Sequence, residues 1–195
     1  RLCAKLTSFL FQDALTEAMT LGKFPFPLRN HWHLPRGEYT DFIGVNYYTR
    51  STVSGIGDGV RDNSPRNDLG WEIYPAGIVE CSRALMAVLP RPIWITENGT
   101  CDNRDTFRCR YLYEHLKTLA ESGLPVERYY HWCFCDNFEW VEGNSAQFGL
   151  VSVDAVSRER RVKESGRFYS EIIRRGGVDE ALYQQYVAKQ EYHVR

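Results

Sequence analysis

Apolar residues recur at helical spacing in several segments of the chain. In residues 7–21, Leu10, Ala14 and Ala18 fall on one face, and Gly22 follows as a suitable end to the helix. The same spacing predicts further helices over residues 75–89, around Leu112, Leu116 and Leu119, over residues 164–175, and from residue 178 to about 190. These helices alternate with shorter runs of a different pattern.

The runs between the helices are rich in apolar, β-branched and aromatic residues, which predicts strands. They span residues 41–50, 92–96 and 126–136, with a short extended piece at 148–154. Near-continuous apolar strands that alternate with helices indicate a parallel sheet covered by helices. The longer loops, 54–68, 100–105 and 141–147, follow strands. Barrel and doubly wound enzymes place their chemistry in such loops, so we expect an α/β fold with one functional edge.

Polar and aromatic side chains gather at the carboxyl end of each main strand, and parallel strands bring these ends together at one edge. Indole faces beside carboxylate and amide groups suit a sugar ring, whose C–H face stacks on an aromatic ring while its hydroxyls take polar partners. The alternative is that the tryptophans belong to the core and that Glu139 pairs with an arginine. The residues concerned are Asn46, Tyr47, Tyr48, Glu97, Asn98, His131, Trp132, Asp136, Asn137, Glu139 and Trp140.

Glu97 is a candidate functional residue because it directly follows a largely apolar strand, Pro92–Thr96. A carboxylate is costly to remove from water unless partners compensate for the loss, so it is either satisfied by neighbours or used chemically. A phenol such as Tyr48, at the end of another strand, could donate a hydrogen bond to this carboxylate and orient it.

Composition narrows the class of protein. Hydrophobic residues make up 43% of the chain and charged residues 25%, as in globular proteins. The formal net charge of -1 argues against a nucleic-acid partner, and the basic stretch at residues 158–161 is expected to be a solvated loop. No apolar run is long enough to span a membrane, and no signal peptide is visible. The aromatic content of 14% fits either a large core or a stacking site.

The six cysteines form no C-x-x-C pair. We therefore expect free, buried thiols in a reducing compartment, which favours a cytoplasmic location. Their spacing does not suit a zinc site, so no metal is expected. Cys133 and Cys135 are expected on opposite faces of one strand.

Several motifs together resemble glycoside hydrolase family 1, the β-glucosidase and β-galactosidase family of (β/α)8 barrels. The segment WITENGT is similar to the family's nucleophile motif, DFIGVNYYTR to its sixth strand, and HWCFCDNFEW with the following FGL to its last strand and loop. Residues Asp105, Arg108, Tyr111 and Leu112 also fall at the family's D-x-x-R-x-x-Y-L spacing. The motifs occur in the family's order from about Thr7 to Arg175.

The resemblance implies a retaining β-glycosidase that works through a covalent glycosyl-enzyme, without a metal or organic cofactor. Glu97 would be the nucleophile, and Tyr48 would hydrogen-bond and orient it. Substrate-binding roles follow for a further set: Asn46 on the carboxylate or the sugar's 2-hydroxyl, Trp132 beneath the glycone ring, Glu139 and Trp140 on the remote hydroxyls, and Phe148 nearer the leaving group. Glucoside, fucoside and galactoside substrates all remain possible.

The resemblance covers only part of the family's fold. A retaining glycosidase needs a second carboxyl about 5–5.5 Å from the nucleophile, which the family supplies in an N-E-P motif on its fourth strand. This chain has no such motif. We therefore expect residues 1–195 to be the C-terminal portion of one TIM-barrel domain, about strands six to eight, completed by an N-terminal chain or segment. The alternatives are a truncated chain, a catalytically inactive glycan-binding protein, or an inert fragment without a stable fold.

Overall fold

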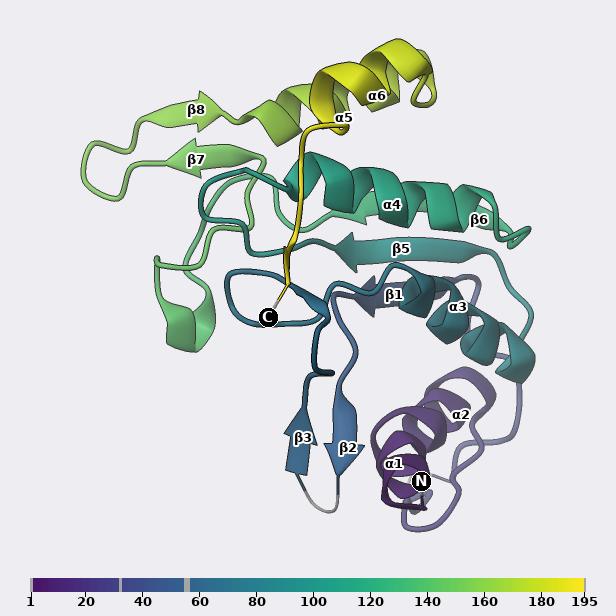
Figure 1. Ribbon diagram of the computed structural model, residues 1–195. Coiled ribbons are helices and arrows are strands. Elements are labelled where there is room, and N and C mark those ends of the chain that lie inside the picture. The colour runs from purple at the N-terminus through teal and green to yellow at the C-terminus, as the bar shows by residue number, and fades with distance from the viewer. Residues whose placement is uncertain (1, 32, 55–56, 195) are drawn as a thin grey trace.

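A computed structural model describes residues 2–31, 33–54 and 57–194. Its centre is a three-stranded parallel sheet in the order β1-β5-β6. The strands are β1 (Ile43–Tyr47), β5 (Ile93–Asn98) and β6 (Val126–His131). They lie side by side with their carboxyl ends at one edge (Figure 1). The predicted parallel sheet is thus confirmed.

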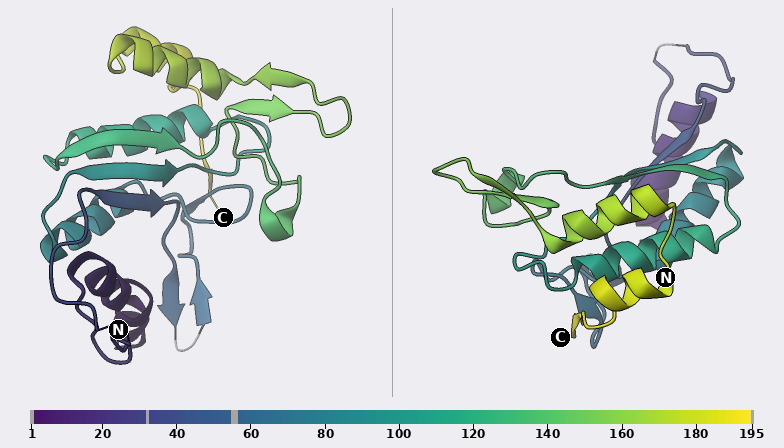
Figure 2. Two further views of the ribbon diagram at one scale, coloured as in Figure 1. Left: turned by 180° about the vertical axis from the view of Figure 1, so that it is seen from behind. Right: turned by 90° about the horizontal axis from the view of Figure 1, so that it is seen from above.

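Helices cover one face of this sheet. Ile78 and Val79 of α3 (Ala76–Val88) and Leu119 of α4 (Arg108–Ala120) pack in one core with Ile93 and Ile95 of β5. Figure 2 shows α4, α5 and α6 on the same side of the sheet. The two outer helices are α5 (Glu164–Arg175) and α6 (Glu180–Tyr186). This arrangement leaves the opposite face of the sheet without a covering helix layer within the described residues.

The N-terminal segment is helical almost from its start. It consists of α1 (Leu2–Ser8), a π-helical turn at Phe9–Asp13 and α2 (Ala14–Leu21). Gly22 has a φ of 60° and ends the helix in the left-handed conformation that glycine adopts most readily. The predicted helix over residues 7–21 is confirmed, and it begins earlier than its apolar pattern indicated.

Three predicted segments differ from the structure. The strand predicted to continue to residue 136 ends at His131. Beyond it, Cys133 and Asp136 pair through their backbones with residues 148–151, outside the sheet, so Cys133 and Cys135 do not alternate across a strand. The apolar run of residues 132–135 misled the prediction, because Trp132 and Cys133 pack on the following loop whereas Phe134 is exposed.

The other two corrections concern loops that contain strands. Part of the predicted loop 54–68 forms the hairpin of β2 (Thr52–Ser54) and β3 (Gly57–Gly59), and its residues 55–56 lie outside the described residues. Residues 160–161 of the basic stretch 158–161 belong to β8 (Arg160–Val162), which pairs with the predicted extended piece. Four further short strands are β4 (Pro65–Arg66), β7 (Val151–Val153), β8 (Arg160–Val162) and β9 (His193–Val194), with β4 paired to β9 and β7 to β8.

The cysteines are all free, as expected, although only Cys101, Cys109 and Cys133 are buried. Within the described part of the chain, no group of His, Cys, Asp and Glu side chains could hold a metal ion. None of the helices described here is long and apolar enough to cross a membrane.

Candidate functional site

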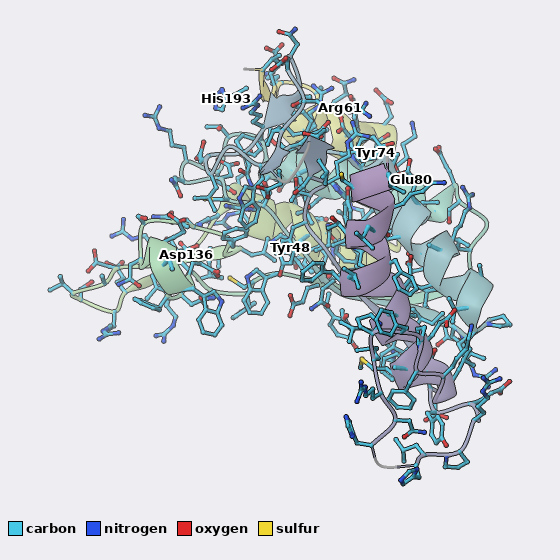
Figure 3. The ribbon with its side chains drawn as sticks, turned by 90° about the horizontal axis from the view of Figure 1, so that it is seen from below. Tyr48, Arg61, Tyr74, Glu80, Asp136 and His193 are labelled. Carbon is cyan, nitrogen blue, oxygen red and sulfur yellow. The ribbon has the colours of Figure 1, made fainter. Side chains whose placement is uncertain are left out.

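Glu97 and Tyr48 meet at the carboxyl ends of β5 and β1. The Tyr48 hydroxyl donates a hydrogen bond of 2.6 Å to Glu97 Oε2. Burial and this bond to Glu97 raise the pKa of Tyr48, so the phenol stays protonated and acts as the donor. Figure 3 shows Tyr48 near the centre of the molecule and Asp136 to its left. The predicted contact between phenol and carboxylate is therefore present.

Asn46 is the β1 partner of Glu97 in the strand register and is exposed. Its Oδ1 accepts a hydrogen bond of 2.6 Å from the Thr96 hydroxyl. Among the hydrogen bonds of the described residues, none joins Asn46 to the Glu97 carboxylate. Asn46 is predicted to contact either the carboxylate or the 2-hydroxyl of the sugar; no hydrogen bond to the carboxylate supports the first alternative, and the second stays a prediction.

Trp132 and Glu139 form the second part of the site. Trp132 lies just beyond β6, and its Nε1 donates a hydrogen bond of 3.2 Å to Glu139 Oε1. Both side chains are half-buried. No arginine of the described chain forms an ion pair with Glu139, so the alternative arginine pairing is not observed. An indole edge and a carboxylate are therefore held next to each other at the same end of the sheet.

Trp140 and Phe148 occupy opposite environments. Trp140 opens a short 3₁₀ turn and is 81% exposed. Phe148 is only 2% exposed and packs edge-on against Tyr48, with ring centroids 6.3 Å apart. Phe148 therefore packs against the Tyr48 ring and helps to fix it. Its burial does not fit the predicted place near a leaving group.

Three other polar residues predicted at the strand ends turn away from the site. Asn98 is fully buried and faces α4. The Nε2 atom of His131 is 3.3 Å from the Phe148 carbonyl oxygen. Burial lowers the pKa of His131 to about 3, so its ring is neutral. Asp136 accepts hydrogen bonds from Lys163 Nζ at 2.9 Å and Gly149 N at 2.8 Å. These side chains hold the framework together.

Sequence reasoning missed Trp71, which lies beside Tyr48 and Phe148. Its ring centroid is 6.3 Å from that of Tyr48 and 5.9 Å from that of Phe148. The Asn67 carboxamide accepts hydrogen bonds from the backbone N–H groups of Leu69 and Trp71 and so fixes the turn that presents the indole. The segment Asn67-Asp68-Leu69-Gly70 was the available signal, because asparagine and glycine at this spacing favour such a turn.

A second missed residue is Gly99, directly after Asn98. A Cβ placed there would collide with the carbonyl oxygen of Trp132. Only glycine therefore allows the backbone after β5 to pass this close to the backbone after β6. The close approach brings the Glu97 and Trp132 parts of the site together.

Comparison with known proteins places this geometry in context. The family model described as glycosyl hydrolase family 1 matches residues 33–178. A β-galactosidase of Pyrococcus woesei is 34% identical in an alignment that covers 93% of this chain and 41% of that protein.

Solved structures agree with this match. A β-glycosidase from Pyrococcus horikoshii superposes with a TM-score of 0.81 at 34% identity, over 94% of this chain and 45% of that one. A family 1 β-glucosidase from Thermotoga maritima superposes with a TM-score of 0.67 at 33% identity. This match covers 73% of this chain and 36% of that one. The chain thus spans less than half the length of these relatives.

The extent of these matches confirms that the three parallel strands and their helices are part of a (β/α)8 barrel. The match of the family model covers well over half of the residues and includes both Glu97 and Tyr48. The chain belongs to glycosyl hydrolase family 1.

Proposed function

We propose that this chain supplies the nucleophile and the glycone-binding residues of a retaining β-glycosidase. The observation that carries the proposal is the hydrogen bond of 2.6 Å from the Tyr48 phenol to the Glu97 carboxylate. A neutral phenol donating to one carboxylate oxygen orients the other for attack. The relatives named above are glycosidases, and the Thermotoga maritima enzyme was solved with isofagomine lactam.

In the proposed reaction, Glu97 attacks the anomeric carbon of a β-linked glycoside. A carboxylate oxygen forms the new bond to C1 while the bond from C1 to the aglycone oxygen breaks, and the electron pair stays with that oxygen. An acid/base carboxyl gives the aglycone its proton. In the second step this group takes a proton from water, which attacks C1 and releases Glu97.

Trp132, Glu139 and Trp140 are the groups we propose for holding the glycone. Trp132 presents an aromatic face, and its N–H already fixes the Glu139 carboxylate at 3.2 Å. Glu139 can then accept hydrogen bonds from sugar hydroxyls with its remaining lone pairs. Trp140 is exposed enough to reach a ligand that enters from solvent.

The acid/base must come from elsewhere, since this sequence contains no N-E-P motif. We propose that it lies on the strands that complete the barrel, in one domain with residues 1–195. The isolated chain is then expected not to hydrolyse aryl β-glycosides, and turnover at ordinary enzyme rates by that chain alone would contradict the two-part arrangement.

Glu97→Ala in the completed barrel gives a chemical test. The variant should lose hydrolysis of a dinitrophenyl β-glucoside, since no carboxylate remains to attack C1. Added azide should restore release of dinitrophenol and form the α-glycosyl azide, because azide then attacks from the face that Glu97 occupied. A Glu142→Ala variant, which changes an exposed glutamate in the loop after β6, is the matched control and should retain activity. Hydrolysis by Glu97→Ala without azide would overturn the assignment.

A further inference from the structure

Strand β5 carries one extra residue at the point where Glu97 lies. Toward β1, Val45 pairs with Ile95 and the next residue, Asn46, pairs with Glu97. Thr96 and Glu97 therefore lie opposite a single residue of β1. Two residues opposite one define a β-bulge, and bulges frequently redirect side chains next to active sites.

The same irregularity occurs toward β6. Ile95 pairs with Tyr129, and Asn98 pairs with His131, so β5 again has one residue more than its neighbour. The bulge changes the direction of the side chains that follow it. Ile93 and Ile95 are buried toward the helices, and Asn98 is buried on that side too, although strict alternation would place it on the opposite face.

Asn98 is held on the helix side by hydrogen bonds to three elements. Its Nδ2 donates to the Tyr47 carbonyl of β1 at 2.6 Å and to the Tyr111 hydroxyl of α4 at 2.9 Å. Its Oδ1 accepts from the Tyr129 hydroxyl of β6 at 2.7 Å. Its backbone carbonyl accepts from Trp132 N at 2.9 Å. Both amide hydrogens and both carbonyl oxygens of Asn98 are thus used, with none of the side chain exposed.

This network restricts the direction of Glu97. A buried amide without partners is unfavourable, so Asn98 cannot leave the helix side without losing all three side-chain bonds. Successive strand residues point to opposite faces, so fixing Asn98 toward α4 directs Glu97 toward the uncovered face, where Tyr48 lies. The Asn98 bond to the Tyr47 carbonyl also fixes the backbone just before Tyr48. One buried amide therefore controls both partners of the phenol–carboxylate hydrogen bond.

We propose that Asn98, with Tyr129 as its hydrogen-bond donor, is a positioning residue that turns Glu97 toward the substrate. Asn98 touches neither the substrate nor the reacting atoms. It acts by keeping the β5 bulge in register with both neighbouring strands. The catalytic consequence rests on the proposed role of Glu97, whereas the geometric consequence does not.

The test compares three variants of the completed barrel. Asn98→Leu keeps the approximate volume and removes every side-chain hydrogen bond. Tyr129→Phe removes only the hydroxyl that donates to Asn98. Tyr169→Phe is the matched control, because its half-buried hydroxyl donates to the Tyr129 carbonyl at 3.2 Å and makes no contact with Asn98.

Two measurements are made on each variant. The first is the rate constant for covalent labelling by 2-deoxy-2-fluoro-β-glucosyl fluoride, separated from the inhibitor's dissociation constant. We expect labelling to slow about tenfold in Tyr129→Phe and about a hundredfold in Asn98→Leu at an unchanged dissociation constant, as misplacement of a reacting group predicts. The Tyr169→Phe control should label at the wild-type rate while having a melting temperature close to that of Tyr129→Phe.

The second measurement is the crystal structure of each variant. The bond between Tyr48 and Glu97 is expected to be lost in Asn98→Leu, lengthened in Tyr129→Phe and retained in Tyr169→Phe. If Asn98→Leu does not fold, the Tyr129→Phe variant alone tests the positioning role of Asn98. An intact Tyr48–Glu97 bond in Tyr129→Phe, or labelling no slower than in Tyr169→Phe, overturns the inference. If wild-type protein is not labelled at Glu97, the proposed function fails, and the crystal structures alone decide the positioning role.

Discussion

The carboxyl end of β5 and the loop after β6 both carry residues of the candidate site, but they are held differently. At the end of β5, the residue after Glu97 is fully buried and bonded to β1, α4 and β6. In the loop, Trp140 is 81% exposed, and among the described residues the Glu139 carboxylate accepts one side-chain hydrogen bond, from Trp132.

This difference matches two functions, the placement of a nucleophile and the recognition of a sugar. A nucleophile must be placed accurately against one carbon atom, and buried hydrogen bonds between rigid elements provide that accuracy. Groups that recognise a sugar can lie on a loop positioned by the scaffold. The loop is nevertheless tied down at its base, where Asp136 bonds to Lys163 and to the backbone of Gly149. Changes at the buried anchors should therefore affect folding strongly, and changes in the exposed loop should not.

The largest loss of stability is expected for Lys163→Met. Lys163 and Asp136 are only 9% and 10% exposed, so removal of the cation leaves a buried carboxylate without its partner. We expect the free energy of unfolding to fall by about 3–5 kcal/mol. Urea denaturation measures it. The control, Glu159→Gln, breaks the solvent-exposed pair with Arg161 and should leave the midpoint unchanged. Equal effects of the two substitutions would remove the distinction between buried anchor and surface.

Gly99→Ala should come next. The added methyl group would collide with the Trp132 carbonyl oxygen. Because this neighbour is backbone, the collision can be relieved only if the ends of β5 and β6 move apart. We expect a loss of about 3 kcal/mol, at the upper end of the usual range for overpacking, measured by thermal unfolding. Gly177→Ala is the control, since nothing lies within 4 Å of a Cβ at that position. A Gly99→Ala protein as stable as this control would show that the two strand ends can separate freely.

An effect that develops only in acid is expected from His115 of α4, which is fully buried beside the Tyr47 ring. Burial lowers its pKa to about 4, while its Nδ1 lies 2.8 Å from the Tyr111 carbonyl. Between about pH 6.5 and 4 the unfolded state binds a proton that the folded state does not. Stability contributed by the neutral ring is therefore present above pH 6.5 and is lost as the pH falls, by up to about 1.4 kcal/mol per pH unit.

The free energy of unfolding of His115→Gln, measured across this pH range, checks the direction of this pH dependence. Because the variant lacks the titrating ring, its stability should decline less steeply as the pH falls. His31→Gln, at an exposed position, serves as the control and should keep the wild-type slope. A wild-type slope in His115→Gln would mean that other buried groups cause the acid sensitivity.

The smallest effect on stability is expected for Trp140→Ala in the loop. With 81% of the side chain exposed, its removal should change the free energy of unfolding by less than about 0.5 kcal/mol. Binding of a glycoside to the completed barrel should weaken nonetheless, which a KM measurement reports. A loss of stability comparable to that of Gly99→Ala would place the loop among the rigid elements.

The sequence predicted the parallel sheet, its helices and the meeting of Tyr48 with Glu97, because these depend on local periodicity and on the common edge of parallel strands. It did not predict the direction of Asn98, since the bulge in β5 becomes visible only in the register with both neighbours. The burial of Phe148 and the pairing of Asp136 with Lys163 depend on contacts between segments far apart in the chain. Periodicity carries no information about such contacts.

The proposed role of Glu97 as the nucleophile can be checked by covalent trapping of the glycosyl-enzyme. The completed barrel is incubated with a 2-deoxy-2-fluoro-β-glucoside that carries a good leaving group, and the product is analysed by intact mass and peptide mapping. We expect one added fluoroglycosyl group, attached to the peptide that contains Glu97, and no label in Glu97→Gln. A label on any other residue, or no label in a folded and complete protein, would contradict it.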